Sequence, residues 1–566
     1  MHKAHRQARQ RQLQEEELLR EIHYRQSLPT VTRKDLYSNG SKKFGLIVAS
    51  PSCSSSSSEE PNFLCDDENN DDENTENSSN DDYEMKISSL PDFILQKHDM
   101  KNLECSGSST NEMNPTETIV RLQCRVHSNR GSGKLHFLIL REGIHFVLAT
   151  LFTTDKEMIH FVKKITPESI VEVFGKVCTA ENEITERVIS GKFKTMEIKI
   201  ERIYILSLAR GLPFTVQDYM VQNFKNQKTS FVKNVSTENQ ISNTQLLDHR
   251  VISLRIPCQL AIFKIQSSVT KYFRQFMEQL EFVEIHTPKL STCQRPYQGR
   301  DLMKVYEVGP VFRKDAGTTY RHLTEFTSLD FEMVIQSHYL EIIHLVEKLL
   351  NSILTRLETE MAQELTLIRQ EQEDDDSEKL LSISSTSIVT NHERTCLVIS
   401  YHEAIALLNN YRQEHQNPLE EIFLPQYGLS THDTQKLSQI IRDTFHRDLF
   451  ILYRFPSSLK SYHVMKPPSI MEEESMHNRL SNSFEVYLRG QCIGSGYQSI
   501  HDHDMLKKEC EKCNGMEWCN LDYLKYGTWP HAGCSFGLER FVMAYLGLGN
   551  VRRSSLFPRD SHRMTP

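Results

Sequence analysis

Two short segments, Gly309-Pro310-Val311-Phe312-Arg313 and Arg321-His322-Leu323-Thr324-Glu325-Phe326, are separated in the chain by a polar loop. They belong to two long runs, 304–313 and 322–334, that predict a large antiparallel hairpin. An arginine on a rigid strand, such as Arg313, suits an α-phosphate because its planar guanidinium donates two hydrogen bonds and keeps its charge. An aromatic ring across the hairpin, such as Phe326, can stack on a purine. The hairpin therefore predicts a nucleotide site, although an arginine taken alone is more often a surface or ion-paired residue.

The sequence around this hairpin has the pattern of an α+β domain that runs from 247 to 566. Apolar residues between Ile262 and Leu280 recur at helical spacing and predict a long amphipathic helix. An acidic run at about 371–387 predicts a loop inserted within the domain. We therefore expect an antiparallel sheet flanked by helices. The other predicted helices lie at 339–365 and 435–447, and the other strands at 282–285, 449–453, 483–489 and 491–495.

A glycine-rich segment near the C-terminus reads Gly533-Cys534-Ser535-Phe536-Gly537-Leu538-Glu539-Arg540. Small residues let the backbone approach a ligand, and Arg540 stands at the opening of a predicted helix. A glycine-rich segment by itself is weak evidence for a site. Combined with the hairpin, it predicts that Arg313 and Arg540 converge on one triphosphate.

Residues 117–212 predict a small β-barrel. Val120, Leu122, Cys124 and Val126 alternate with polar residues, which places one face of a strand in a core. The segment 128–134 predicts a flexible turn. Five strands with a helix between the third and the fourth is the order of an OB-fold, whose open face binds single-stranded nucleic acid. Another small β-barrel is the alternative. The later elements are expected at 135–140, 146–152, 157–165 (the helix), 170–177 and 196–206.

Three further segments have compositions unlike those of the two domains. Residues 1–50 form a charged arm with helical spacing between 4 and 26, which is either solvated or in contact with RNA. Residues 51–116 form a serine-rich and acidic linker that cannot bury enough apolar surface to fold. Residues 213–246 form the predicted hinge between the two domains.

The charge and the apolar content limit the class of protein. The net charge of the 566-residue chain is -9, but residues 59–84 contain no Lys or Arg, and outside them basic residues outnumber acidic ones. A polyanionic partner is therefore compatible with the folded part. No apolar run is long enough to span a bilayer, and the basic start of the chain lacks the apolar region of a secretion signal. The 13 cysteines then suit a reducing compartment, so we expect a cytoplasmic protein without a membrane partner.

The hairpin segments, Gly537 to Arg540 and the terminal Leu556-Phe557-Pro558-Arg559-Asp560 resemble motifs 2 and 3 of the class II aminoacyl-tRNA synthetases. The segment 282–289, centred on Pro288, resembles motif 1, the dimer-interface element. The order of barrel, hinge and catalytic domain is similar to that of the subclass for aspartate, asparagine and lysine. Within it, Ser495-Gly496-Tyr497-Gln498-Ser499-Ile500-His501-Asp502 resembles the Ser-Gly-Ala-Gln-Arg-Ile-His-Asp segment of eukaryotic and archaeal aspartyl enzymes.

This resemblance implies an aspartate–tRNA ligase that uses ATP and magnesium. Aspartate attacks the α-phosphorus of ATP to give aspartyl-adenylate, which then acylates the 3′ end of tRNA(Asp). The catalytic residues implied are Arg313 for the α-phosphate and Arg540 for the γ-phosphate, and Phe326 stacks on adenine. Catalysis consists of positioning and charge neutralisation, without a protein nucleophile. The remaining ATP-binding positions implied are Lys314, Asp315, Arg321, His322, Leu323, Gly537, Leu538 and Glu539.

The resemblance also implies the other sites and partners. The protein would be a homodimer through the Pro288 element, either free or within a multisynthetase complex. The positions implied for aspartate binding are Arg313, Ser495, Gln498 and Ser499, those for the anticodon are Phe137, Leu148 and Glu197, and those for magnesium are Glu485 and Cys492.

Several of these positions depart from the family pattern. Ser499 replaces the arginine that pairs with the substrate's side-chain carboxylate, and the loss of such a bidentate contact costs on the order of a few kcal/mol. Cys492 replaces a magnesium carboxylate, and Leu148 replaces the glutamine that reads the central anticodon base. Between Pro288 and Val305 the acidic loop and the Gln-Ser-Pro-Gln segment of the family are not recognisable.

These departures leave two alternatives open. One is a catalytically impaired paralogue that acts as a tRNA-binding or regulatory protein, and the other is lysine or asparagine specificity. The cysteines and histidines near the C-terminus are better interpreted as structural than as metal ligands, because no second pair of cysteines follows at suitable spacing. They are Cys510, Cys513 and Cys519, and His501 and His503 beside Asp502 and Asp504.

Overall fold

A computed structural model of the chain describes residues 118–180, 183–185, 189, 191–220, 241–289, 302–313, 319–373, 396–414, 428–467, 479–512 and 521–564. The predicted arm (1–50) and linker (51–116) lie outside these residues. So do most of the acidic insertion, part of the hinge, Lys314 and Asp315, Cys513 and Cys519, and residues 290–301 of the shortened segment.

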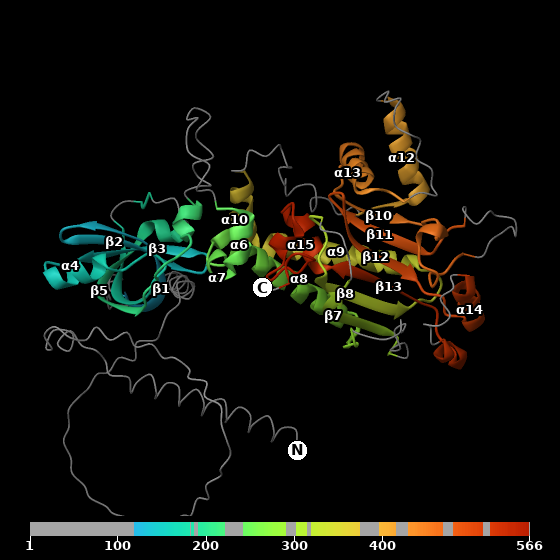
Figure 1. The fold of residues 1–566 in the computed structure, drawn as a ribbon, viewed down its shortest axis with the longest axis horizontal. Helices are drawn as coiled ribbons and strands as arrows, with labels where there is room; N and C mark the ends of the chain where they lie inside the picture. The colour runs from blue at the N-terminus through green and yellow to red at the C-terminus, as the bar shows by residue number, and fades with distance from the viewer. Residues whose placement is uncertain are drawn as a thin grey trace, which may run out of the picture. The chain divides into compact units, whose positions relative to one another are not determined.

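The first described part of the chain is a closed barrel with the strand order β1-β2-β3-β5-β4. The helix α4 (Lys156–Lys163) lies between β3 and β4, and its N-cap residue Asp155 accepts a hydrogen bond from the Glu157 amide. Neighbouring strands are antiparallel except for β3 and β5, which are parallel. This is the order that the sequence predicts, so the OB-like barrel is confirmed (Figure 1). The strands are β1 (Thr118–Ser132), β2 (Leu135–Glu142), β3 (His145–Phe152), β4 (Ile170–Thr179) and β5 (Met196–Ser207).

The first strand is longer than its alternation indicates. A register shift between Val126 and Ser128 lets β1 continue to Ser132, through most of the predicted flexible turn. The turn itself is confined to the two residues between β1 and β2, where Gly133 has a φ of +67°. A side chain other than glycine rarely adopts this left-handed conformation, which explains the glycine at this position.

The second part is built on an eight-stranded sheet, counted over the described residues, with the order β6-β7-β8-β13-β12-β11-β10-β9. The six central strands are antiparallel, as predicted for the sheet, but one of them, β13, was not predicted as a strand because the sequence there is rich in glycine. The two edge strands pair in parallel, β6 with β7 and β9 with β10. Two helices between β9 and β10 provide the crossover that a parallel pair requires. The strands are β6 (Val283–Glu284), β7 (Lys304–Phe312), β8 (Glu325–Val334), β9 (Leu397–Ser400), β10 (Leu449–Tyr453), β11 (Ser483–Leu488), β12 (Gln491–Gln498) and β13 (His531–Gly537).

Helices cover the two faces of this sheet unequally. The helices α8 (Pro257–Gln279), α9 (Leu340–Glu360) and α15 (Leu538–Leu546) share one apolar core with the central strands. The helices α12 (Tyr401–Glu414) and α13 (Thr431–Phe445) pack on the other face, where their apolar cluster includes Phe450 and Leu452 of β10 and Tyr487 of β11, and Figure 1 shows the two helices next to each other. The rest of that face is left open for a site.

The single helix predicted for 339–365 is two helices in the structure. The first, α9, ends at Glu360, and α10 (Ala362–Glu373) begins after Met361. Smaller helices are α6 (Asn243–Asp248), α7 (Arg250–Ser253) and α14 (His503–Lys512). None of the described helices combines the length and the apolarity that crossing a membrane requires.

Alternation along the strands sorts the side chains between the core and the open face. On β8, Leu329 and Phe331 enter the core, so Asp330 and Glu332 face the other way. On β13, Ala532, Cys534 and Phe536 enter the core, which leaves Gly533 and Ser535 on the open face. The open face is therefore polar and carries the candidate site.

Candidate functional site

The hairpin of β7 and β8 places Arg313 beside Phe326. Val311 and Phe326 are opposite each other in the register, and the Arg313 amide donates a hydrogen bond to the Thr324 carbonyl at 2.8 Å. The guanidinium carbon of Arg313 lies 5.2 Å from the centre of the Phe326 ring. The cation and the ring that the sequence singled out are therefore neighbours on one surface.

The second arginine reaches the same place from the start of α15. Because Gly537 pairs with Ser328, the glycine-rich segment runs along β8 beside the hairpin. A methyl group at Gly537 would lie 3.8 Å from Arg540 Cβ and 4.0 Å from Phe326 Cδ2. The Arg540 guanidinium donates to the carbonyls of Arg321 at 3.0 Å and Cys492 at 3.3 Å. Gly537 thus lies between the Cβ of Arg540 and the ring of Phe326, and Arg313, which follows β7, lies beside the same ring.

Two neighbours of Arg540 face the protein interior. Leu538 and Glu539 are 5% and 6% exposed. The Glu539 carboxylate accepts the Thr327 amide at 3.0 and 3.1 Å, and burial raises its pKa. Their side chains fix the start of α15 to β8, so of this segment Gly537 and Arg540 are the residues on the nucleotide side.

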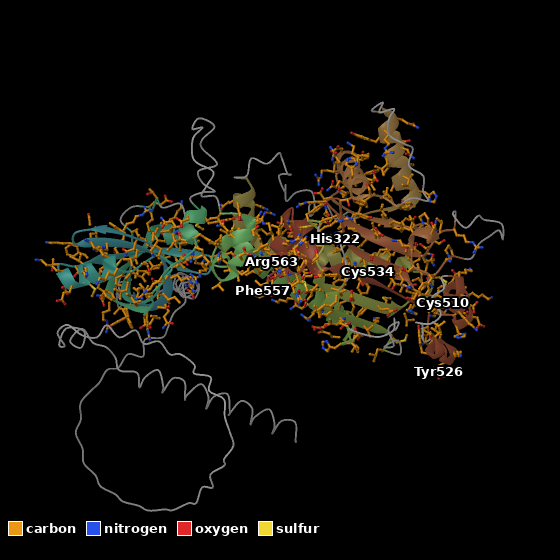
Figure 2. All side chains as sticks on the ribbon, viewed as in Figure 1. His322, Cys510, Tyr526, Cys534, Phe557 and Arg563 are labelled. Carbon is orange, nitrogen blue, oxygen red and sulfur yellow. The ribbon has the colours of Figure 1, made fainter. Side chains whose placement is uncertain are left out.

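The loop end of the hairpin contributes a histidine, His322, and a buried leucine, Leu323. His322 is half-buried and hydrogen bonded to the Thr319 hydroxyl at 2.6 Å, and Figure 2 labels it on this part of the domain. Leu323 is buried, so its side chain supports the hairpin from below. Arg321 is half-buried, and its carbonyl is one of the two that hold Arg540.

The terminal segment braces the base of the hairpin. The Arg559 carbonyl accepts the Thr324 amide at 2.9 Å, and the Arg559 guanidinium pairs with Glu325 at 2.9 Å. Arg250, which sequence reasoning missed, donates to the carbonyls of Leu556 at 2.9 Å and Ser555 at 2.6 Å. Burial lowers its pKa to about 10. A lone arginine far from the motif in the sequence gives no signal of such a contact.

A cavity of about 400 Å³ opens on the polar face beside this hairpin. Ser495 and Ser499 line it, as the sequence predicts for an amino-acid pocket. Gln498 does not line it, because its side chain accepts a hydrogen bond from Asn482 at 2.7 Å. Of the three predicted residues, Ser495 and Ser499 therefore line the cavity, whereas Gln498 does not.

Sequence reasoning missed the charged residues of this cavity. Glu307, Asp330 and Glu332 line it together with Lys289. The Lys289 ammonium pairs with Glu307 at 2.7 Å, and hydrogen bonds from Lys289 and Thr287 lower the pKa of that carboxyl against the opposing effect of burial. Burial raises the pKa of Asp330. A signal is visible in the sequence for two of them, because Asp330 and Glu332 alternate with Leu329, Phe331 and Met333 on β8.

The positions implied for magnesium do not fit that ion. One oxygen of Glu485 pairs with the Lys460 ammonium at 2.5 Å, and the other accepts the Tyr487 hydroxyl at 2.6 Å. The Cys492 thiol donates to the Gly494 carbonyl at 3.5 Å, and burial together with the Glu485 charge raises its pKa to about 12. A protonated thiol is a poor partner for magnesium, which selects hard oxygen ligands. This pair of residues therefore offers no divalent-cation site.

The three positions predicted for the anticodon share one face of the barrel. Leu148 is opposite Glu197 in the register, and Phe137 is opposite Thr150, two residues along the same strand. Phe137 is 41% exposed, whereas Leu148 and Glu197 are half-buried. The exposed ring and the two flanking side chains form a continuous patch.

The remaining predicted residues lie elsewhere. Pro288 is exposed near the edge of the sheet. Cys510 is buried on α14, and Figure 2 shows it and Tyr526 well separated from His322 and Arg563. Cys510 is therefore not part of the hairpin site.

Sequence comparisons identify a protein family and several curated proteins that are similar to this chain. The family model described as tRNA synthetases class II (D, K and N) matches residues 242–303 and 299–561. Cytoplasmic aspartate–tRNA ligase 1 of Arabidopsis thaliana is 33% identical over 481 residues, which is 79% of this chain and 84% of that protein. The human cytoplasmic aspartate–tRNA ligase is 30% identical over 488 residues, covering 80% of this chain and 89% of its own length.

Solved structures agree with the sequence comparisons. The aspartyl-tRNA synthetase of Entamoeba histolytica is 34% identical with a TM-score of 0.68, over 82% of this chain and 94% of that one. Asparaginyl-tRNA synthetase of Pyrococcus horikoshii shares the fold, with 23% identity and a TM-score of 0.61 over 80% of this chain and 96% of that one. The family model, the curated relatives and the solved structures agree, so the chain belongs to the class II tRNA synthetases that comprise the D, K and N enzymes.

Proposed function

We propose that the protein is an aspartate–tRNA ligase. It activates aspartate with ATP and transfers the aspartyl group to the 3′ end of tRNA(Asp). The observation that carries this proposal is Arg313 beside Phe326, with Gly537 between that ring and Arg540, on the same domain as a cavity of about 400 Å³ that charged residues help to line. The names of the curated relatives, cytoplasmic aspartate–tRNA ligases, support aspartate as the amino acid and the cytoplasm as the location.

In the activation step an oxygen of the aspartate α-carboxylate attacks the α-phosphorus of ATP. The bond from that phosphorus to the bridging oxygen breaks, and pyrophosphate leaves with the electron pair. Arg313 holds the α-phosphate and neutralises the charge that develops on it, while Arg540 holds the γ-phosphate. Phe326 stacks on adenine. No protein nucleophile takes part, so the residues act by orienting the reactants.

The cavity beside the hairpin is the proposed aspartate pocket. Its acidic side chains, Glu307, Asp330 and Glu332, suit an α-ammonium group, and Lys289 is a basic side chain within it. Ser495 and Ser499 offer hydroxyl groups to the substrate. The pocket thus recognises the charged ends of an amino acid, with serine where the family has an arginine.

Pyrophosphate exchange with each of the amino acids tests this function. We expect exchange of label into ATP with aspartate and not with lysine or asparagine. Exchange that depends on lysine or asparagine would show that this amino acid, and not aspartate, is the substrate. ATP binding without exchange for any amino acid would instead identify the non-catalytic paralogue.

Ser499→Arg is expected to improve the recognition of aspartate. A guanidinium at this position restores a charge-assisted, bidentate contact with the substrate carboxylate, so the KM for aspartate falls about 10- to 100-fold. The dependence of pyrophosphate exchange on aspartate concentration measures it. Ser499→Met, which adds similar length without charge, serves as the control. An equal KM in the two variants would show that position 499 does not contact the carboxylate.

The barrel is proposed to bind the anticodon of tRNA(Asp) through Phe137. Stacking on an exposed aromatic ring is worth about 1–3 kcal/mol per base, so Phe137→Ala weakens tRNA binding about 5- to 100-fold. Filter binding at fixed salt measures the dissociation constant. The control is Phe445→Ala on α13, because Phe445 and Phe137 are 40% and 41% exposed. If both variants bind tRNA equally well, the patch around Phe137 is not the anticodon site.

The protein is further proposed to be a homodimer through the segment around Pro288. Val283 on the edge strand β6 is 44% exposed and Pro288 is exposed, which leaves this edge available to a second copy.

A further inference from the structure

The end of the nucleotide site nearest Arg540 holds a lysine that neither motif contains. Lys460 follows the short helical turn Ser457–Leu459, and its ammonium lies 2.5 Å from a Glu485 oxygen. The same ammonium is 3.9 Å from the centre of the Phe455 ring. Its side chain is 16% exposed and that of Glu485 is 23% exposed. This lysine is therefore held firmly at one position.

Lys460 and Arg540 belong to one group of charges. Cys492 stands opposite Tyr487 in the register, and the Tyr487 hydroxyl binds Glu485. The Cys492 carbonyl accepts Arg540. Glu485, Arg540 and Lys460 all act electrostatically on the Cys492 thiol. Lys460 and Arg540 are therefore connected through Glu485, Tyr487 and the backbone of Cys492.

The side chains of Arg540, Lys460 and Glu485 together have a net positive charge without any metal ion. Arg540 and Lys460 contribute two positive charges and Glu485 one negative charge, and the residue at position 492 is a cysteine, whose thiol is ordinarily neutral near pH 7. A second carboxylate at position 492 would cancel the remaining charge, and a polyphosphate would then need a bound cation to enter. A divalent ion at Glu485 would also have to displace Lys460 from an oxygen that the ammonium already occupies.

We propose that Lys460, together with Arg540, gives the protein a built-in positive site for the ATP polyphosphate that replaces much of the need for a divalent cation. The proposal rests on the proposed function, since it takes ATP to be the ligand of this site. The cysteine at position 492 and the lysine at position 460 then favour the same result, which is that ATP binds with little dependence on magnesium.

Binding of ATP, measured by calorimetry with purified full-length protein in excess magnesium and in excess EDTA, tests the proposal. We expect the two dissociation constants to agree within about fivefold, which corresponds to roughly 1 kcal/mol. Lys460→Met keeps the length of the side chain and removes its charge, so it weakens binding in EDTA about 10- to 100-fold. Lys436→Met is the matched control, because the Lys436 ammonium lies over the Tyr411 ring on the helical part of the domain.

A second variant tests the same idea in the opposite direction. Cys492→Glu adds a negative charge, so ATP binding in EDTA falls at least about tenfold and magnesium restores it. Wild-type binding that disappears in EDTA and returns with magnesium would overturn the inference and leave the proposed function standing. A wild-type protein that binds no ATP in either condition would overturn the proposed function itself. Circular dichroism of each variant separates loss of binding from loss of folding.

Discussion

Replacing Arg313 with alanine lowers aspartate-dependent pyrophosphate exchange about 100- to 1000-fold, the usual effect of removing one donor that stabilises charge in a transition state. The loss appears mainly in kcat, because the contact strengthens as charge develops on the α-phosphate. The fold tolerates the change, since the Arg313 side chain is exposed. Single-turnover formation of the adenylate measures the step directly.

Arg202→Ala is the matched control for this variant. Its guanidinium carbon lies 4.7 Å from the centre of the Phe174 ring in the barrel, so the same kind of arginine and phenylalanine contact is removed away from the site. We expect normal exchange from Arg202→Ala. A loss below tenfold in Arg313→Ala, or an equal loss in the control, would contradict the role of Arg313.

The largest effect on stability is expected from Arg141→Met in the barrel. Arg141 and Glu168 form an ion pair of 2.7 Å, and their side chains are 2% and 1% exposed. Removing Arg141 leaves the buried Glu168 carboxylate with Arg255, 3.3 Å away, as its remaining basic partner, and loss of one partner of a buried pair costs about 3–5 kcal/mol of unfolding free energy. Burial lowers the pKa of Arg141 despite the opposing effect of Glu168, because desolvation disfavours the charged guanidinium.

Hydrogen exchange of amides in β1 and β2, followed by mass spectrometry, reports the stability of the barrel itself. Lys194→Ala is the control, because Lys194 and Glu183 form a 3.4 Å pair whose side chains are 43% and 68% exposed. Such a surface pair contributes about 0–1 kcal/mol. The double variant Arg141→Met with Glu168→Leu should recover much of the loss. Unchanged protection in Arg141→Met would show that the pair does not stabilise the barrel.

The sequence predicts correctly those strands whose local pattern of apolar residues matches their burial in the core. Strand β10 was expected at 449–453, which is where it lies, because both alternate sets of its residues are buried, between α12 and α13 on one side and the main core on the other. The hairpin motif likewise predicts Arg313 and Phe326 as neighbours, because strand register fixes which residues are opposite.

Other features depend on contacts that no local pattern contains. The parallel edge strand β9 was not predicted, because only four residues, 397–400, form it beside β10. Arg250 and Lys460 are single basic residues whose partners come from distant parts of the chain. Burial of Leu538 and Glu539 depends on how α15 packs against the sheet. The sequence therefore predicts elements with a local pattern better than contacts between distant parts of the chain.

A crystal structure of the protein with ATP, or with a non-hydrolysable aspartyl-adenylate analogue, tests the central claim most directly. The account predicts adenine stacked on Phe326, the α-phosphate within hydrogen-bond distance of Arg313, and, with ATP, the γ-phosphate bound to Arg540. The aspartyl part of the analogue should lie in the cavity that Ser495 and Ser499 line. A nucleotide bound elsewhere, or bound here without contact to either arginine, would contradict the account.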